Sequence, residues 1–258
     1  MRTIAIMNNK GGVGKTATTI NLADIISREK KKRCTIFDID GQRNLTRFFF
    51  PDLDLEKVVT TADLLLGNGD AAWDSNLQMV SETLGVVPGT PVLYDLDVAA
   101  VTRDERCRIH RRAFVEFKRA MEADGTEDFL LFDCPPGFTS ASCAALMAAD
   151  EVIIPVVIDG FNFDGIADMR RQILNMRKVN TSIHISGVLI NQWHRSELVL
   201  QGEALLRGLD IHTFDTVIRR SEKVPESTVA KSPIRLYSPR SAASMDFRSW
   251  VDELLGEV

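Results

Sequence analysis

A glycine-rich segment constrains the fold of this chain more than any other feature. Residues 8–16 (NNKGGVGKT) follow a short apolar run at 3–7 (TIAIM) and precede a helical pattern at 15–29. Strand, glycine-rich loop and helix N-terminus form the setting of a phosphate-binding loop, because glycines let backbone N–H groups approach an anion. Lys15 is placed to reach the β- and γ-phosphates, and the Thr16 hydroxyl to ligate Mg²⁺. The alternative is a glycine-rich turn without a ligand.

Further apolar runs predict the rest of the sheet. They occupy residues 34–39, 129–133, 151–158 and 183–190, and helical patterns separate them. Each run is apolar along its whole length, which is typical of parallel strands covered on both faces. Residues 77–87 predict a further strand pair, and 239–255 a closing amphipathic helix. We therefore expect one doubly wound, mostly parallel α/β domain over residues 1–258.

The charge is unevenly distributed along the chain. The formal net charge is -5, but residues 219–248 contain seven basic and three acidic side chains. A basic segment of this kind can bind a polyanion locally, although the whole chain is mildly acidic. Residues 103–122 predict an arginine-rich helix on which Arg108, Arg111 and Arg112 share a face. Its basic residues are Arg103, Arg106, Arg108, Arg111, Arg112, Lys118 and Arg119, and a solvated face is the expected reading.

Cysteine spacing and hydropathy exclude several classes of protein. Cys34, Cys107, Cys134 and Cys143 include no C-x-x-C pair, so a zinc or thioredoxin-like site is not expected. Reduced thiols, buried in the cases of Cys34 and Cys134, are the expected state. The sequence begins without a signal-peptide pattern and contains no apolar stretch long enough for a membrane helix. We expect a cytoplasmic protein.

The glycine-rich loop also carries a family resemblance. Residues 10–16 (KGGVGKT) resemble the deviant phosphate loop of the ParA/MinD group of ATPases, with Asn9 where the general pattern has its first glycine. The resemblance implies that Lys10 reaches across a homodimer to the partner's nucleotide, where it acts with Lys15 in catalysis. A surface lysine without a role is the alternative for Lys10. The implied nucleotide contacts are Lys10, Gly11, Gly12, Val13, Gly14, Lys15, Thr16 and Ala17.

Two acidic segments continue this resemblance. Residues 38–44 (DIDGQRN) resemble the family's switch segment D-x-D-P-Q-x-N, with Gly41 in place of proline. The resemblance implies that Asp40 positions or activates the attacking water and that Asp38 helps to organise the Mg²⁺ shell. Asp133, in the segment DCPPG after an apolar run, occupies the Walker-B position that holds Mg²⁺. A turn or cap role is the usual alternative for a lone aspartate after a strand.

The segment 217–226 (VIRRSEKVPE) resembles the ParA/Soj pattern I-P-R-N-x-x-x-x-E-A. The resemblance implies that Arg219 lies beside the adenine and that basic residues nearby contact DNA. Asn191 is a second candidate for the adenine, with a turn-forming role equally open. The basic segment lacks interleaved aromatic residues, which predicts salt-sensitive phosphate contact without base readout. The DNA candidates are Arg219, Arg220, Lys223, Arg235, Arg240 and Arg248.

Other branches of the group fit less well. Residues 245–258 carry four acidic side chains and one arginine, so an anionic membrane should repel this end. The cysteines lack an iron–sulfur context, and no helix-turn-helix region precedes the phosphate loop. The resemblance implies an ATP-dependent homodimer on nucleoid DNA, which binds double-stranded DNA non-specifically and is stimulated by a centromere-binding partner. The alternatives are a related ATPase that positions a protein cargo or matures a metallocentre, and a regulatory module that senses ATP.

Overall fold

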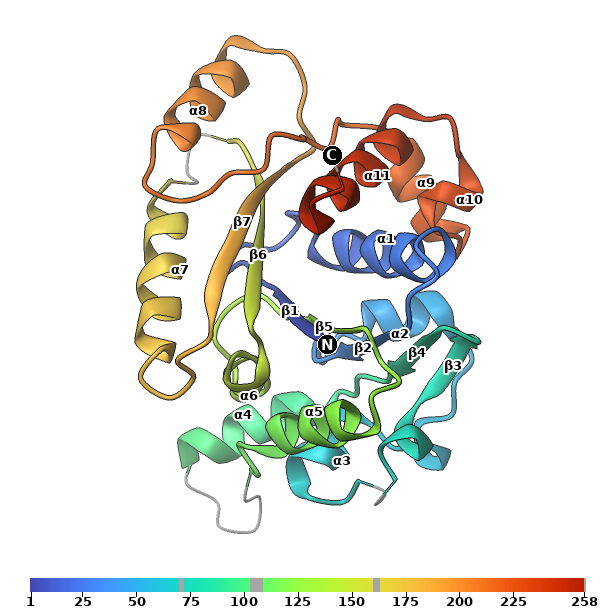
Figure 1. Ribbon diagram of the computed structural model, residues 1–258. Coiled ribbons are helices and arrows are strands. Elements are labelled where there is room, and N and C mark those ends of the chain that lie inside the picture. The colour runs from blue at the N-terminus through green and yellow to red at the C-terminus, as the bar shows by residue number, and fades with distance from the viewer. Residues whose placement is uncertain (70–71, 103–108, 160–162, 258) are drawn as a thin grey trace.

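A largely parallel sheet, buried on both faces, organises the molecule (Figure 1). The computed structural model describes residues 1–69, 72–102, 109–159 and 163–257. Among these residues, seven strands form one sheet in the order β3-β4-β2-β5-β1-β6-β7, and only β3 and β4 pair in antiparallel fashion. The predicted doubly wound α/β fold is confirmed. The strands are β1 (Arg2–Ile6), β2 (Cys34–Asp38), β3 (Gln78–Ser81), β4 (Leu84–Val87), β5 (Phe129–Asp133), β6 (Glu151–Val157) and β7 (His184–Asn191).

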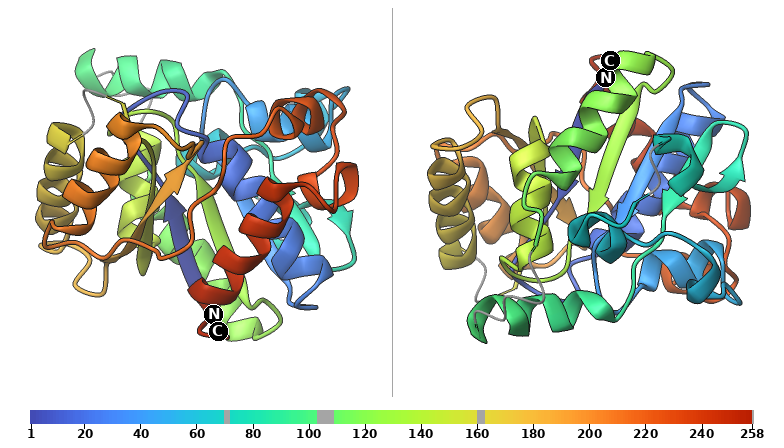
Figure 2. Two further views of the ribbon diagram at one scale, coloured as in Figure 1. Left: turned by 90° about the horizontal axis from the view of Figure 1, so that it is seen from above. Right: turned by 90° about the horizontal axis from the view of Figure 1, so that it is seen from below.

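Helices cover both faces of this sheet (Figure 2). On one face α1 (Lys15–Arg28) packs beside α11 (Ala242–Leu255), and on the other α5 (Ala113–Asp124) packs beside α6 (Ser140–Ala148). The other helices are α2 (Asn44–Phe49), α3 (Thr61–Leu66), α4 (Val92–Thr102), α7 (Phe163–Met176), α8 (Glu197–Arg207), α9 (Lys223–Val229) and α10 (Ile234–Tyr237), with short 3₁₀ turns η1 (Leu55–Lys57) and η2 (Trp73–Asn76).

The alternation of side chains along the strands divides the core into two clusters. On β1, Ala5 packs in the cluster under α5 and α6, whereas Ile4 packs in the cluster under α1 and α11. Phe37 anchors the first cluster through edge-to-face contacts with Phe114, Phe117 and Phe132, at centroid distances of 4.9 to 5.3 Å. Trp250 of α11 is fully buried in the second. Both faces are therefore sealed, as the apolar strand pattern requires.

Most predicted boundaries lie within a few residues of the observed ones. Residues 129–133 coincide with β5, and the pair predicted at 77–87 appears as β3 and β4. The predicted closing helix begins at Ala242, where the Ser241 side chain accepts a hydrogen bond from the backbone N–H of Ser244. Cys34 and Cys134 are buried, as expected.

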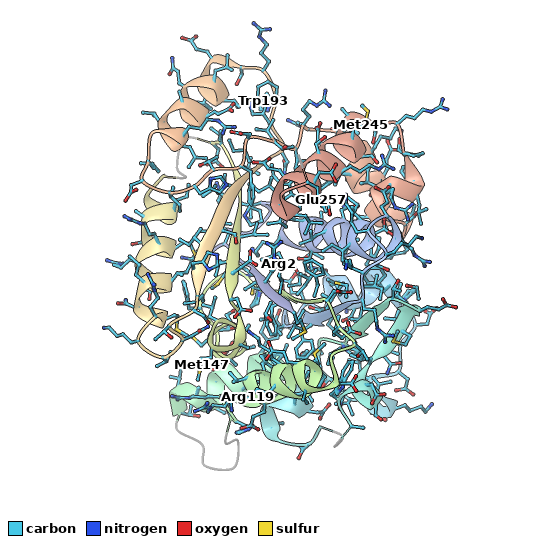
Figure 3. All side chains as sticks on the ribbon, in the orientation of Figure 1. Arg2, Arg119, Met147, Trp193, Met245 and Glu257 are labelled. Atoms are coloured by element: carbon cyan, nitrogen blue, oxygen red, sulfur yellow. The ribbon has the colours of Figure 1, made fainter. Side chains whose placement is uncertain are left out.

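The prediction for the arginine-rich segment is wrong in one respect. Helix α5 begins only at Ala113, and residues 111–112 form a turn, so Arg111 and Arg112 do not share a helical face. Arg103, Arg106, Cys107 and Arg108 lie outside the described residues. On α5 itself, Arg119 is exposed (Figure 3) and Lys118 pairs with Asp150 at 2.7 Å. Arg119 is thus solvated and Lys118 is ion-paired, as expected of a charged helix face.

The topology brings three carboxyl-terminal strand ends together. β5 lies between β1 and β2, and Asp133 at its end is in register with Ile6 on one side and Asp38 on the other. The loops that follow these three strands therefore meet at one edge of the sheet. In open α/β sheets this edge is where ligands bind.

Candidate nucleotide site

The loop after β1 has the backbone of an anion site. Gly12 and Gly14 adopt φ angles of 75° and 88°, in the left-handed region that favours glycine. A Cβ on Gly14 would also lie 2.9 Å from the Nδ2 atom of Asn191. Helix α1 starts directly after Gly14, and no side chain of the described residues caps it. Its first N–H groups thus point toward the loop without a side-chain acceptor, which suits a phosphate.

The two lysines of this segment have different surroundings. Lys15 is buried, and its Nζ donates a 2.9 Å hydrogen bond to the carbonyl oxygen of Lys10. Burial lowers the pKa of Lys15, and the negative charge of Asp133 opposes that effect. The Lys10 side chain is half-exposed and forms an ion pair with Asp159, just beyond β6. The structure thus brings Lys15 to the phosphate position and leaves Lys10 at the surface of the loop.

Asp133 sits at the centre of the site. Its Oδ2 accepts a 2.8 Å hydrogen bond from the Thr16 hydroxyl, and its Oδ1 a 2.9 Å bond from the Thr19 hydroxyl. Burial, and then the charge of neighbouring Asp38, raise the pKa of Asp133 to about 8. Hydroxyl and carboxylate oxygens are the donors that Mg²⁺ prefers. Among the described residues no cluster of three or more His, Cys, Asp or Glu forms a metal cage. Thr16 and Asp133 therefore fit an ion that is also held by nucleotide phosphates.

Asp38 has a different set of partners. Its Oδ2 accepts hydrogen bonds from the backbone N–H and the hydroxyl of Thr46, at 2.8 and 2.6 Å, and its Oδ1 accepts one from the Asp40 N–H at 3.2 Å. Burial raises the pKa of Asp38 to about 6. Both oxygens thus tie the switch segment to the start of α2. The predicted part of Asp38 in organising the Mg²⁺ shell stays a prediction.

Asp40 faces the same centre from the switch segment. It is buried, its Oδ1 accepts a 2.9 Å hydrogen bond from the Gln42 N–H, and its charge acts on Lys15. Gly89 packs closely against the backbone of this segment. A Cβ at Gly89 would lie 3.0 Å from the carbonyl oxygens of Asp38 and Asp40. Sequence reasoning missed Gly89 and Thr46, because their positions carry no local signal for contacts with a segment distant in the chain.

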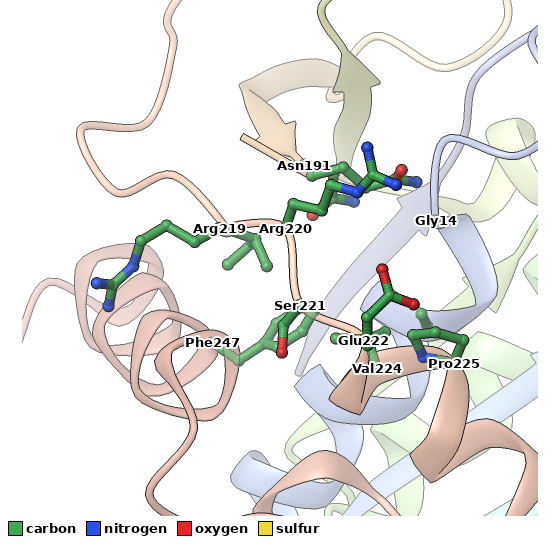
Figure 4. A pocket seen from close by; sticks show the side chains of 12 residues that line it. Gly14, Asn191, Arg219, Arg220, Ser221, Glu222, Val224, Pro225 and Phe247 are labelled. Carbon is green, nitrogen blue, oxygen red and sulfur yellow. The ribbon is translucent and has the colours of Figure 1, made fainter. Parts of the chain in front are cut away.

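A pocket of about 360 Å³ opens beside the loop (Figure 4). Asn191 lines it and donates hydrogen bonds to the Val13 carbonyl at 2.9 Å and the Thr18 hydroxyl at 3.1 Å. Its place at the pocket wall agrees with an adenine-side position, although its amide is already engaged with the loop. The lining residues are Gly14, Ala17, Asn191, Gln192, Ile218, Arg219, Arg220, Ser221, Glu222, Val224, Pro225 and Phe247.

The two neighbouring arginines of this pocket point in opposite directions (Figure 4). Arg219 lines the pocket, but its guanidinium turns away and forms an ion pair with Asp246 of α11 at 2.6 Å. The Arg220 side chain extends toward Gly14 and Asn191. Of the two guanidinium groups, that of Arg220 is the one directed at the pocket, whereas the resemblance predicts that Arg219 lies beside the adenine.

The predicted DNA contacts divide into two groups. Four of the six form ion pairs within the chain: Arg219 with Asp246, Lys223 with Glu226, Arg235 with Asp24, and Arg248 with Glu29. Arg220 and Arg240 are exposed, and neither forms an ion pair among the residues that the structure describes. The basic segment therefore presents less unpaired charge than its composition suggests.

Comparisons with known proteins agree with this site. Residues 1–185 match the family described as AAA domain. The chain is 33% identical over 243 residues to the sporulation initiation inhibitor protein Soj of Bacillus subtilis, covering 92% of each. It is 27% identical over 260 residues to the chromosome partitioning protein ParA of Caulobacter vibrioides, covering 99% of this chain and 94% of that one.

A solved structure shows the same fold. The septum site-determining protein MinD from Pyrococcus horikoshii, complexed with Mg-ADP, superposes with a TM-score of 0.77 at 24% identity, covering 98% of this chain and 95% of that one. No described helix is long and apolar enough to cross a membrane. By sequence and site, the chain belongs to the AAA-domain family of P-loop ATPases, together with its relatives Soj and ParA.

Proposed function

We propose that this ATPase is a dimerisation switch that binds double-stranded DNA non-specifically when it holds ATP and Mg²⁺. The observation that carries the proposal is the loop at residues 10–16, in which Lys15 is buried at the phosphate position and Lys10 lies half-exposed at its surface. A cation at the surface can serve a second subunit, as an arginine finger does. Relatives named for chromosome partitioning support the DNA role.

In this mechanism the N–H groups of the loop and Lys15 bind the phosphates. Thr16 and Asp133 hold Mg²⁺, which offsets the phosphate charge. Asp40, fixed through the Gln42 N–H, orients the attacking water and accepts its proton. Lys10 leaves Asp159 and reaches the phosphates bound to the partner subunit. Dimerisation therefore depends on bound nucleotide. Binding of the γ-phosphate orders residues 38–44 and 133–137.

The DNA surface we propose centres on Arg240, with Lys223 contributing once its surface pair with Glu226 exchanges. Exposed ion pairs of this kind are weak, so phosphate can displace them. Arg235 and Arg248 are expected to contribute less, because both lie partly buried against acidic residues of α1 or its end. A centromere-binding partner would stimulate hydrolysis, and cytoplasmic protein would gather on the nucleoid.

The test is binding to a random-sequence DNA duplex with ATP, with ADP and without nucleotide, at two salt concentrations. We expect binding with ATP alone and a steep loss at the higher salt. Arg240→Glu should weaken it about tenfold, through one lost phosphate contact and one added repulsion. Arg119→Glu, the same change on the exposed face of α5, is the matched control and should leave affinity unchanged.

A second function is favoured by the four internal ion pairs of the basic segment. An ATPase that positions a protein cargo, or matures a metallocentre, needs the same nucleotide site and no DNA surface. ATP-dependent dimers without DNA binding in any nucleotide state would support this alternative and refute the DNA role.

A further inference from the structure

The switch segment contains a glycine that its own backbone does not require. Gly41 occupies the position where the family pattern has proline, and it is absent from the residues with positive φ. It is nevertheless buried, because the ring of Tyr94 from α4 lies against it. A Cβ at Gly41 would lie 2.7 Å from both Cε2 and Cζ of that ring. Gly41 thus provides space for Tyr94, and a proline would collide with the ring.

The polar end of Tyr94 meets the residues of the switch segment. Its hydroxyl lies near the Gln42 side chain and in the field of Asp40. Partial burial and the Asp40 charge raise the pKa of Tyr94, so the phenol is neutral and keeps its proton. Gln42 in turn donates its N–H to the Asp40 carboxylate at 2.9 Å. Tyr94 therefore lies against the backbone of Gly41 and beside the residue whose backbone N–H fixes Asp40.

Helix α4 connects this contact to α6, the helix that follows residues 133–137. Leu93 and Leu96 anchor the helix in the core. One turn after Tyr94, the Asp97 Oδ1 accepts a 2.7 Å hydrogen bond from the backbone N–H of Ser140, the first residue of α6. Helix α4 therefore contacts the switch segment after β2 through Tyr94, and the start of α6, which follows residues 133–137, through Asp97.

We propose that Tyr94 is a positioning residue for ATP hydrolysis, whose ring replaces the missing proline and holds residues 38–44 in the conformation that Asp40 needs. The inference rests on the proposed role of Asp40. A tyrosine on a packed helix restricts the segment from outside, whereas a proline restricts it through its own φ angle. Gly41 and Tyr94 then act together, and substitution of either residue alone should disturb the conformation of residues 38–44.

The test is a double-mutant cycle on Tyr94→Ala and Gly41→Pro. We expect each single variant to lower kcat about tenfold, with KM for ATP and nucleotide affinity unchanged. The double variant should recover to within about threefold of the parent, because proline restores the restraint where the ring is gone. Tyr94→Phe separates the ring from the hydroxyl and should retain most of the activity if packing dominates.

A readout independent of activity is tryptic cleavage after Arg43, inside the switch segment. Tyr94→Ala should accelerate this cleavage, and the double variant should reverse the effect. An unchanged kcat in Tyr94→Ala, or a double variant worse than either single variant, would overturn the inference. Asp40→Ala measured in parallel separates the two hypotheses: if it hydrolyses normally, the role of Asp40 fails; if it is inactive while Tyr94→Ala is normal, the Tyr94 inference alone fails.

Discussion

At the scale of single residues, we expect Lys15 to contribute strongly to nucleotide binding. Its amino group is buried beside the Lys10 carbonyl and in the field of Asp133, so it is held in place before the nucleotide arrives. Lys15→Met should weaken ATP binding by about 2 kcal/mol, roughly 30-fold, through loss of a charge-assisted contact. Calorimetric titration measures it, with the exposed Lys57→Met as control. Equal affinities for the two variants would contradict the loop assignment.

Asp40 is expected to act on the chemical step. Asp40→Asn keeps the shape of the side chain and an oxygen for the Gln42 N–H, but it removes the carboxylate. We predict ATP affinity within about threefold of the parent and hydrolysis slower by about 100-fold or more, the usual contribution of a positioned base. Single-turnover kinetics separate these quantities. Rapid turnover in this variant would remove Asp40 from the mechanism.

The buried carboxyls predict how stability depends on pH without nucleotide. Burial raises the pKa of Asp133 to about 8 and that of Asp38 to about 6, whereas an unfolded aspartate titrates near 3.8. Between these values the folded chain binds more protons than the unfolded chain, so the free energy of unfolding falls as pH rises from about 4 to 8. Denaturant melts across this range measure the slope. Asp133→Asn should flatten it; an unchanged slope would contradict the assignment.

At the scale of elements, a partly buried ion pair docks α10 on α1. The Arg235 Nε lies 2.7 Å from Asp24 Oδ2, and the Asp24 side chain is only 5% exposed. Arg235→Met strands that carboxylate and should lower the free energy of unfolding by about 3 kcal/mol. Adding Asp24→Leu should restore most of the loss, as denaturant titration would show. DNA affinity should fall less than in Arg240→Glu; a larger loss of DNA binding with normal stability would place Arg235 at the centre of the DNA surface instead.

The sequence predicted the elements whose burial is complete on both faces. The run at 129–133 is apolar throughout and coincides with β5, because parallel strands under two helical layers need apolar side chains in both directions. Helix starts were harder to predict. The turn at Arg111 and Arg112 ends a charged stretch that alone suggests a helix, and α2 begins after Arg43 in a left-handed conformation that an arginine does not signal.

The residues of the site also fall into those that local sequence predicts and those that depend on the fold. The phosphate loop and Asp133 follow from local spacing, since strand, loop and helix are consecutive. The contacts of Thr46 with Asp38, of Tyr94 with Gly41, and of Arg219 with Asp246 depend on strand order and helix docking. Nothing in the local sequence specifies those distances, so the orientations of the Arg219 and Arg220 side chains became clear only from the fold.

At the scale of the whole molecule, the proposed pairing of two chains depends on Lys10, which must exchange Asp159 for the phosphates of the second subunit. In the single chain its side chain pairs with Asp159, and both side chains are about two-fifths exposed, at 42% and 43%. Such a pair is weak enough to break when a second subunit offers a phosphate. We therefore propose that nucleotide must be present before two chains can pair.

Sedimentation velocity of Asp40→Ala, which should hold ATP without hydrolysing it, tests that claim most directly. With Mg²⁺ and ATP we predict a dimer, and with ADP a monomer. Addition of Lys10→Ala should leave the ATP-bound protein monomeric while nucleotide affinity is retained. A monomer with ATP, or a dimer that forms equally well without Lys10, would contradict the account.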